Sequence, residues 1–313
     1  MCFGFNAPGA LRRSLEEKGV DRRSFLRGAV AAGVGVGLAG IGGTAAVAAP
    51  AAQAAGRPVA PGLISIQLYT LRSIMRGEGI EATLASLADF GFTKVELAGL
   101  YGRTAEAMRG TLDSLGITPS SSHDGISATP AALETKIANA VTLGQTHINV
   151  PYLVSSSADN WRRWADQMNE EAAVAQQSGL KYGYHNHAHE FTTDLGGGLT
   201  PWDIFTSRLD PKLVHLEVDL YWAVSGGVGV GAADPIQFAI DTILQAPQKV
   251  LQYHVKDRDV SGGFADLGTG TIDFARIFRA HTPKEFIVEN DQPDVTPLQT
   301  AEVGYNYLRT LRF

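Results

Sequence analysis

The chain has 313 residues, of which 44% are apolar, so it is long enough to bury a core of its own without disulfide staples. Its formal net charge of −6 argues against a nucleic-acid partner or an anionic membrane surface, because both require a clustered basic face. A small-molecule partner is therefore the better expectation.

Residues 1–55 are predicted to be a twin-arginine signal peptide and linker. Arg22 and Arg23 precede the apolar pair Phe25 and Leu26, and a Gly/Ala/Val-rich run without acidic residues follows at 28–49. This pattern resembles the signals that export folded proteins, often with a metal or cofactor in place. We expect a periplasmic or extracellular protein with no stable membrane anchor after cleavage near 46–48 or 52–54.

The alternative for residues 28–49 is a transmembrane anchor, since the run is long enough to span a bilayer. It is disfavoured because the run is rich in Gly and Ala rather than in Leu and Ile. Cys2 is the only cysteine and lies in the segment predicted to be removed. The mature chain can therefore use neither thiolate catalysis nor thiolate zinc ligation.

Eight short segments rich in β-branched and aromatic residues follow the linker at intervals of roughly 24 to 37 residues, and each is typical of a buried strand. They are LISIQLY from Leu63, TKVELAG from Thr93, ITPSSSH from Ile117, THINVPYL from Thr146, LKYGYHNH from Leu180, LVHLEVDLYW from Leu213, VLQYHVKD from Val250 and EFIVEN from Glu285.

Amphipathic helices are predicted between these strands, for example at 81–90, 104–115, 131–143 and 160–178. Glycine follows each of the four, in the pattern of a helix C-cap. Eight repeats of strand and helix predict a (β/α)8 TIM barrel over residues 62–313, as a single domain. An open doubly wound sheet is the alternative, but no Gly-rich phosphate loop follows the first strand.

The barrel prediction places chemistry at the C-terminal ends of the strands, where polar side chains converge on one mouth. The fifth strand ends with His185 and His187, which share a face if the strand continues. Either could be a structural histidine, and the pattern alone leaves open which of them would bind a ligand.

The later strands add further ionisable groups. The sixth carries Glu217 and Asp219 in an apolar run, and a buried carboxylate needs either a salt bridge or a metal. The seventh carries His254 and Lys256, and the eighth carries Glu289. Imidazoles and carboxylates from consecutive strands predict one mixed nitrogen and oxygen site, which suits Mn²⁺, Zn²⁺, Fe²⁺ or Co²⁺ better than Ca²⁺ or Mg²⁺.

With these motifs in place, the chain resembles the xylose isomerase-like TIM-barrel family of sugar phosphate isomerases and epimerases over about residues 63–313. The matching motifs are VELAG at 95–99, YHNHxxEF at 184–191, EVDLYW at 217–222, HVKD at 254–257 and VEND around Glu289. The resemblance implies one divalent metal held by side chains from strands five to eight. By motif, those side chains are His185, Asp219, His254 and Glu289.

The chain departs from the well-known epimerases of this family at two positions. They have Glu where this chain has His185, and His where this chain has Trp222. Of the two metal-bound Glu side chains that move the proton in such enzymes, Glu289 alone remains. The candidates for further proton transfer are Glu217, Lys256, His187 and Glu96.

Other side chains at strand ends are candidates for substrate binding. Glu96 and His123 could contact substrate hydroxyls, as could Asn149, while Trp222 could stack on a sugar ring. The Gly-rich stretch 262–270 follows the seventh strand, where many barrels bind phosphate through backbone N–H groups. Export argues against a phosphorylated intracellular substrate.

The leading hypothesis is a metal-dependent isomerase or epimerase of a sugar or keto-sugar, which removes a proton next to a metal-polarised carbonyl. The loss of one Glu keeps a second hypothesis close, namely a lyase or hydrolase of 3-keto glycosides on the same barrel. A non-catalytic exported sugar-binding barrel is the third. A nuclease of the endonuclease IV type is disfavoured by the acidic balance, and a homo-oligomer is compatible with the sequence.

Overall fold

The computed structural model describes residues 56–77 and 79–313. The predicted twin-arginine segment and both predicted cleavage sites lie outside these residues. Within the described ranges, no helix has both the length and the apolar character that crossing a membrane requires.

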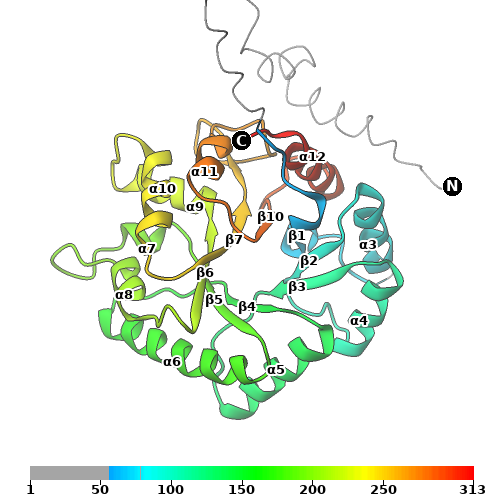
Figure 1. The fold of residues 1–313 in the computed structure, drawn as a ribbon, viewed down its shortest axis with the longest axis horizontal. Coiled ribbons are helices and arrows are strands. Elements are labelled where there is room, and N and C mark those ends of the chain that lie inside the picture. The colour runs from blue at the N-terminus through cyan, green and yellow to red at the C-terminus, as the bar shows by residue number, and fades with distance from the viewer. Residues whose placement is uncertain (1–55, 78) are drawn as a thin grey trace, which may run out of the picture.

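Eight parallel strands form the predicted barrel, with the strands at the centre of Figure 1 and the helices around them. They are β1 (Ile64–Gln67), β2 (Lys94–Leu97), β3 (Thr118–Ser122), β4 (His147–Val150), β5 (Lys181–His185), β6 (Val214–Asp219), β7 (Val250–Val255) and β10 (Glu285–Val288). Each of the eight lies within or overlaps a segment predicted from the sequence. The hydrogen-bonded order is β3-β2-β1-β10-β7-β6-β5-β4, which is the chain order of a barrel opened between β3 and β4.

The seam between β3 and β4 is closed by fewer bonds than the other strand pairs. His123 and Asn149 form a parallel bridge there, and the N–H of Asp124 donates to the carbonyl of Asn149 at 2.9 Å. The N–H of Thr146 donates to the carbonyl of Ser120 at 3.1 Å. The barrel is therefore nearly closed, and the (β/α)8 prediction is confirmed.

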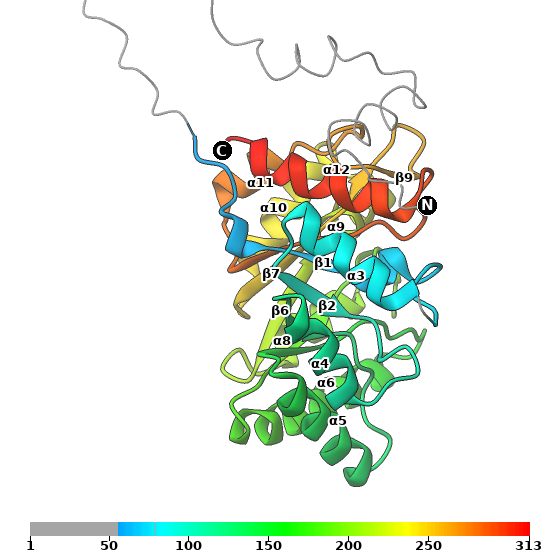
Figure 2. The same cartoon turned by 90° about the vertical axis from the view of Figure 1, so that its right-hand side faces the viewer.

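Helices alternate with the strands and cover the outside of the barrel (Figures 1 and 2). They are α3 (Gly79–Phe90), α4 (Ala105–Ser114), α5 (Pro130–Leu143), α6 (Ala158–Gln177), α7 (His189–Thr192), α8 (Pro201–Arg208), α9 (Leu220–Gly229), α10 (Pro235–Gln245), α11 (Phe274–Ala280) and α12 (Pro297–Thr310). The final helix packs against α3, and the N–H of Arg57 donates to the carbonyl of Phe313, so both ends of the described barrel meet.

Helix α5 shows the capping chemistry at both ends, including the predicted glycine at its C-terminus. Thr129 caps α5 by accepting a hydrogen bond from the N–H of Ala132, and Pro130 occupies the first turn, where its missing N–H costs nothing. Gly144 ends the same helix with φ 74°, a left-handed conformation that glycine adopts without strain.

The two faces of the strands differ in chemistry. The outer faces pack apolar side chains such as Ile64, Ile66, Val95 and Val218 against the helices. The inner faces carry buried polar side chains, which are Ser65, Gln67, Glu96, Ser121, Asn149, His215, Glu217, Gln252 and His254. Interiors of such barrels are usually filled by Val, Ile and Leu, so this interior is unusually polar.

Candidate active site

A cavity of about 630 Å³ opens at the C-terminal ends of the strands, where the sequence placed the site. Its lining contains six of the predicted site residues together with residues from the surrounding loops. The lining residues are Tyr69, Arg72, Ala98, His123, Pro151, Tyr152, His185, His187, Trp222, Lys256, Phe264, Glu289, Asp291 and Gln292. A second cavity of about 480 Å³ lies at α8 and α10 and contains none of the predicted site residues.

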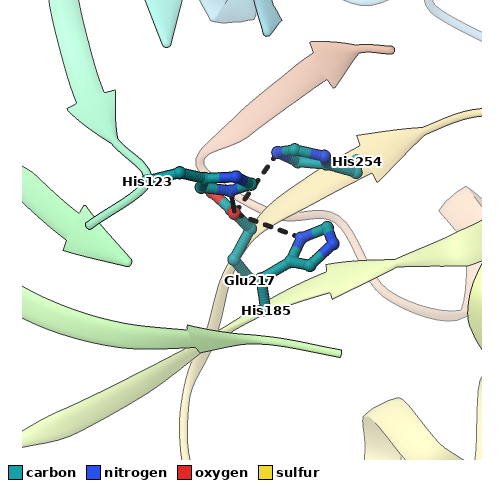
Figure 3. A group of neighbouring side chains, drawn as sticks. All are labelled: His123, His185, Glu217 and His254. Atoms are coloured by element: carbon teal, nitrogen blue, oxygen red, sulfur yellow. Dashed lines mark hydrogen bonds and ion pairs between the residues drawn. The ribbon is translucent and has the colours of Figure 1, made fainter. Parts of the chain in front are cut away.

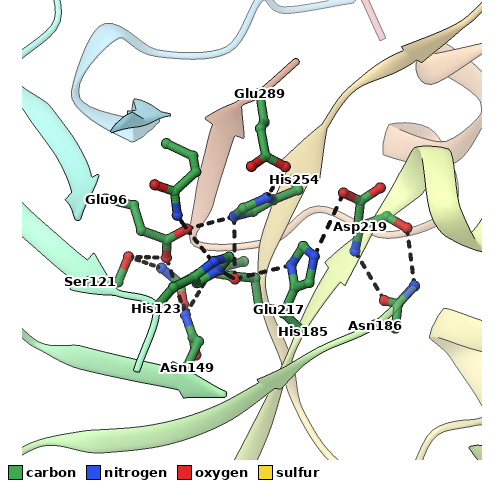
Figure 4. A network of polar contacts seen from close by, with 12 residues as sticks. Glu96, Ser121, His123, Asn149, His185, Asn186, Glu217, Asp219, His254 and Glu289 are labelled. Atoms are coloured by element: carbon green, nitrogen blue, oxygen red, sulfur yellow. Dashed lines mark hydrogen bonds and ion pairs between the residues drawn. The ribbon is translucent and has the colours of Figure 1, made fainter. Parts of the chain in front are cut away.

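His254 lies at the centre of the buried charges. Its Nδ1 is 2.8 Å from Oε2 of Glu289, and its Nε2 is 2.6 Å from Oε1 of Glu96 and 3.3 Å from Oε1 of Glu217. Burial alone would lower the pKa of His254, but the charges of Glu217, Glu289 and Glu96 outweigh burial and hold this pKa well above its usual range. One imidazole therefore connects the mouth to a deeper layer (Figure 4).

Asp219 is held by its place at the end of β6. Its Oδ1 accepts from the N–H of Trp222 and thereby caps α9, and its own N–H donates to Oδ1 of Asn186 on the neighbouring strand end. The parallel register sets Asp219 beside His254. Its Oδ2 is left to face Lys256 Nζ at 3.0 Å and His185 Nε2 at 3.9 Å. Burial raises the pKa of Asp219 to about 6, although the Lys256 charge opposes the shift.

Lys256 is buried and lies among three carboxylates. Its Nζ is 3.0 Å from Asp219, 2.7 Å from Glu289 and 3.0 Å from Asp291. Burial would lower the pKa of Lys256, but the nearby carboxylates raise it above its ordinary value. Burial would raise the pKa of Glu289, but the charges of Lys256 and His254 hold it well below its usual range. Glu289 is thus an ionised carboxylate in the cavity wall.

The structure distinguishes the two histidines that the sequence left open. His185 is the last residue of β5, with Nε2 toward Asp219 and Nδ1 3.4 Å from Oε1 of Glu217. His187 lies beyond the strand, where its ring is 5.2 Å from that of Trp222. Burial, with the charge of His254, lowers the pKa of His185 to about 3, so this imidazole is neutral and able to bind a metal.

Glu217 and Glu96 form a layer beneath the mouth. Figure 3 shows the imidazoles of His123, His185 and His254 directed at the carboxylate of Glu217. Nδ2 of Asn149 donates to Glu217 at 2.6 Å, and Glu96 accepts from Ser121 at 2.5 Å and from Gln67 at 2.7 Å. Neither carboxylate lines the cavity, so both can orient imidazoles but do not reach a substrate there.

Two groups of these side chains could hold a metal ion. The ligand atoms of Asp219, His254 and Glu289 lie within 4.8 Å of one another, and the same holds for those of His123, His185, Glu217 and His254. The first group, with His185 beside it, coincides with the set implied by the family resemblance. Two imidazoles and two carboxylates with other carboxylates behind them fit a divalent transition metal. The surplus of carboxyl groups over Lys256 also favours a bound cation.

Several cavity residues were missed by the sequence analysis as site residues, among them Asp291, Arg72, Tyr152 and Phe264. Asp291 lies two residues after Glu289, and Lys256 holds both. Burial and the charge of Glu289 raise the pKa of Asp291. Arg72, Tyr152 and Phe264 come from loops or short elements, where no strand periodicity marks an inward side chain. Only Asp291 carried a usable signal, because it stands in the same short motif as Glu289.

Two weaker expectations need correction. Asn149 is fully buried and donates to Glu96, Glu217 and Gln252, so it supports the site and does not reach a substrate hydroxyl at the mouth. The Gly-rich stretch is no phosphate cradle, because Asp257 accepts from the N–H groups of Gly268 and Gly270. Backbone donors that already serve an internal carboxylate are not available to a phosphate.

The model of the family described as xylose isomerase-like TIM barrel matches residues 66–293. A search of curated proteins gave no match. Among solved structures, a sugar phosphate isomerase/epimerase from Parabacteroides distasonis is 22% identical, with 84% of this chain and 99% of that chain covered and a TM-score of 0.65.

Two further solved structures have the same fold. An L-ribulose 3-epimerase is 19% identical, with 78% of this chain and 92% of that chain covered and a TM-score of 0.55. The IOLI protein, whose structure holds a zinc atom, is 13% identical, with 80% and 99% covered and a TM-score of 0.59.

Proposed function

Because the chain belongs to the xylose isomerase-like TIM barrel family, we propose that it is a divalent-metal-dependent isomerase or epimerase of a sugar or keto-sugar. One observation carries the proposal. Glu289 and Asp291 line the cavity with His185, and both contact Lys256. Lys256 also contacts Asp219, and Glu289 contacts His254. The metal would be held by His185, Asp219, His254 and Glu289, and when bound it would polarise a substrate carbonyl and acidify the neighbouring C–H.

The protein side chains would then move the proton. Glu289, ionised, removes the proton from the carbon next to the carbonyl, and the electron pair passes to the carbonyl oxygen. Lys256 stabilises that oxygen with its positive charge. Asp291, whose pKa is raised, is suited to give a proton to the former carbonyl carbon, while the hydroxyl proton of the neighbouring carbon passes to the former carbonyl oxygen and a new carbonyl group forms. Exchange with solvent then removes the proton from Glu289 and returns one to Asp291. Such a pair of carboxyl groups with opposite pKa shifts is typical of an acid and base couple.

The position of the two carboxyl groups favours isomerisation over epimerisation. Both contact one ammonium group, with oxygens 2.7 Å and 3.0 Å from Lys256 Nζ, so the two oxygens lie within about 6 Å of each other, and we infer that they would meet a substrate from the same side. Transfer of a proton between neighbouring carbons can occur on one face of the substrate. Inversion of a single carbon needs groups on opposite faces.

A second candidate is a lyase of 3-keto glycosides, and the same one-sided arrangement favours it. Glu289 would remove the proton at C2, the electron pair would form a C1–C2 double bond, and the C1–O bond would break. Asp291, whose pKa is raised, would protonate the departing oxygen. His185 stands where the well-known epimerases have their second Glu. Burial lowers the pKa of His185 to about 3, so its neutral imidazole does not replace that carboxylate as a base.

Incubation in D₂O tests both candidates. The purified full-length chain, supplied in turn with Mn²⁺, Zn²⁺, Co²⁺ and Fe²⁺, is mixed with free ketoses and with 3-keto glycosides. Deuterium uptake at carbon without cleavage supports the isomerase, and release of the aglycone supports the lyase. The metalloenzyme proposal is wrong if the protein binds none of these ions and none raises its melting temperature.

The twin-arginine segment leads us to propose that the enzyme acts outside the cytoplasm. Fractionation of cells that express the full-length chain, with Arg22 and Arg23 replaced by Lys as the control, tests this proposal. Retention of both forms in the cytoplasm would contradict it.

A further inference from the structure

The rim of the cavity is aromatic, although its floor is charged. Tyr69 is 43% exposed and Tyr152 is 53% exposed, whereas Lys256 and Glu289 below them are buried. Trp222 and Phe264 line the wall between the two levels, with ring centroids 5.8 Å apart. We call Tyr69, Tyr152, Trp222 and Phe264 the aromatic rim. Exposed aromatic groups that gather around a cavity mark a surface for a ligand.

The exposed rings of the rim are held in place. The guanidinium carbon of Arg72 is 3.9 Å from the centre of the Tyr69 ring, and Arg72 is itself fixed by hydrogen bonds to the carbonyls of Tyr69 and Asp291. The Tyr152 ring contacts the imidazoles of His187 and His189 edge-on, at 5.1 Å and 5.2 Å. Rings that are ordered before binding lose little conformational entropy when a ligand arrives.

The cavity has more room than a single sugar needs. A hexose has about twelve non-hydrogen atoms, and even at the ~30 Å³ that a water molecule occupies in the liquid it would fill at most about 360 Å³. The cavity holds about 630 Å³. If the reacting carbons lie at Glu289 and Lys256, as the proposed function requires, the remaining space lies toward the rim.

We propose that this space binds an aromatic group attached to the keto-sugar, so that the substrate is an aryl 3-keto glycoside and not a free monosaccharide. The inference rests on the proposed function only in placing the sugar at the charged floor. Aromatic pairs add about 0.5–1.5 kcal/mol beyond area burial, roughly a twofold to tenfold gain in affinity.

A second sugar ring would suit the rim less well. Such a ring carries hydroxyl groups around its edge, and each needs a hydrogen-bond partner when it is buried. Ala98, Pro151 and Phe264 offer none from their side chains, so only the hydroxyls of Tyr69 and Tyr152, the indole N–H of Trp222 and the remaining N–H groups of Arg72 could serve the hydroxyls of a second ring at the rim. Flat apolar surface is what these residues can bury.

Matched ligands test the proposal by titration calorimetry on the full-length chain with Mn²⁺. The panel pairs phenyl and methyl glycosides of glucose, galactose, mannose and xylose, each with its 3-keto form, and adds the corresponding disaccharides. We expect at least one phenyl compound to bind about tenfold more tightly than its methyl partner. The proposal is overturned if no phenyl compound does so, or if a disaccharide binds as tightly as the best phenyl glycoside.

Variants then locate the binding surface. Tyr152→Ala should reduce the preference for phenyl over methyl by roughly threefold to tenfold, while Tyr152→Phe, which keeps the ring, should preserve it. Leu244→Ala is the matched surface control, because Leu244 is 56% exposed on α10 and does not line the cavity. An equal loss in Leu244→Ala, or none in Tyr152→Ala, would contradict the placement.

The readout separates this proposal from the proposed function. Binding of phenyl glycosides without deuterium exchange or cleavage would leave the aromatic subsite standing and remove the catalytic proposal. Exchange on free sugars with no phenyl preference would do the reverse.

Discussion

Two histidines inside the barrel, His215 and His254, have nearly the same burial and opposite chemistry. His254 on β7 has carboxylate oxygens within 3.3 Å of both ring nitrogens. His215 on β6 lies deeper, near the start of its strand, beside the amide of Gln252 at 3.3 Å and the ring of His147 at 5.1 Å. The pKa of His254 is raised well above its usual range, whereas burial lowers that of His215 to about 4.

The difference shows that carboxylates, and not histidines alone, decide where this interior can hold a cation. At the mouth, Glu217, Asp219 and Glu289 surround the imidazoles of His185 and His254. At the other end, His147 and His215 are neutral and meet amides and hydroxyl groups. The predictions below either break this comparison or make it quantitative.

Replacing Lys256 by Met should give the largest effect. The ammonium group is the buried partner of Asp219, Glu289 and Asp291, so its loss should cost about 3–5 kcal/mol of unfolding free energy in chelator. Mn²⁺ should recover most of this loss, because a cation among the same carboxylates replaces the missing charge. Urea denaturation with and without Mn²⁺ measures both values.

Lys136→Met is the control for that experiment. Lys136 forms a buried ion pair of 2.6 Å with Glu171, away from the 630 Å³ cavity. Its loss should also destabilise the protein, but Mn²⁺ should not restore it beyond the stabilisation seen in the unaltered chain. Equal recovery in both variants would show that the rescue does not arise at the mouth.

Replacing His254 by Ala should remove metal binding. Loss of a direct ligand should exceed the 10- to 100-fold cost known for outer partners of a metal, so we expect affinity to fall by at least about 100-fold. His215→Asn alters the comparable imidazole at the other end and should leave metal affinity within about twofold, as an unrelated site would. Metal titration with a competing chelator compares them, and similar losses would refute the distinction between the two ends.

Replacing Glu217 by Gln should have a smaller effect on the same measurement. Glu217 does not line the cavity, but Oε1 faces His185 Nδ1 and His254 Nε2, which would orient both imidazoles. We expect metal affinity to fall about 10- to 100-fold, with a changed pH dependence of binding. Glu285→Gln is the matched control, because Glu285 is also buried and accepts from Gln252 at 3.0 Å. Unchanged binding in Glu217→Gln would mean that Glu217 only fills the interior.

Much of the fold could be predicted from the sequence because it depends on local patterns. The predicted segments contain or overlap all eight strands, and Gly144 marked the end of α5. The polar interior was not predicted. Gly183, for example, would be expected to weaken β5, yet a side chain there would collide with Asn149 and His215. The need for glycine at position 183 arises from side chains on other strands, which no local pattern reveals.

For the site, the sequence identified the strand ends but not the depth of each side chain. Glu217 and Asp219 are two residues apart and face the same side, but only the structure places Glu217 beneath the imidazoles and Asp219 against Lys256. Tyr152 and Arg72 reach the cavity from loops, whose course depends on the closed barrel. The spacing of residues in a strand predicts the face on which each side chain lies. The distance of that side chain from the mouth depends on the assembled barrel.

The smallest predicted effect is a pH dependence of the free energy of unfolding, which arises at the end of the barrel opposite the mouth. It is measured with His147→Gln. Burial and the charge of His215 lower the pKa of His147 to about 3, against 6.5 as its ordinary value. Below pH 6.5, His147 therefore binds a proton in the unfolded chain but not in the folded chain. The stability present above pH 6.5 is lost as pH falls. The unaltered protein should lose about 1 kcal/mol more than the variant between pH 6.5 and 5.5. His254, with a raised pKa, contributes stability below pH 6.5 that is lost as pH rises, and it does so equally in both proteins. Chemical denaturation at several pH values measures the free energy of unfolding of each protein. An equal dependence on pH in His147→Gln and the unaltered chain would contradict a neutral His147.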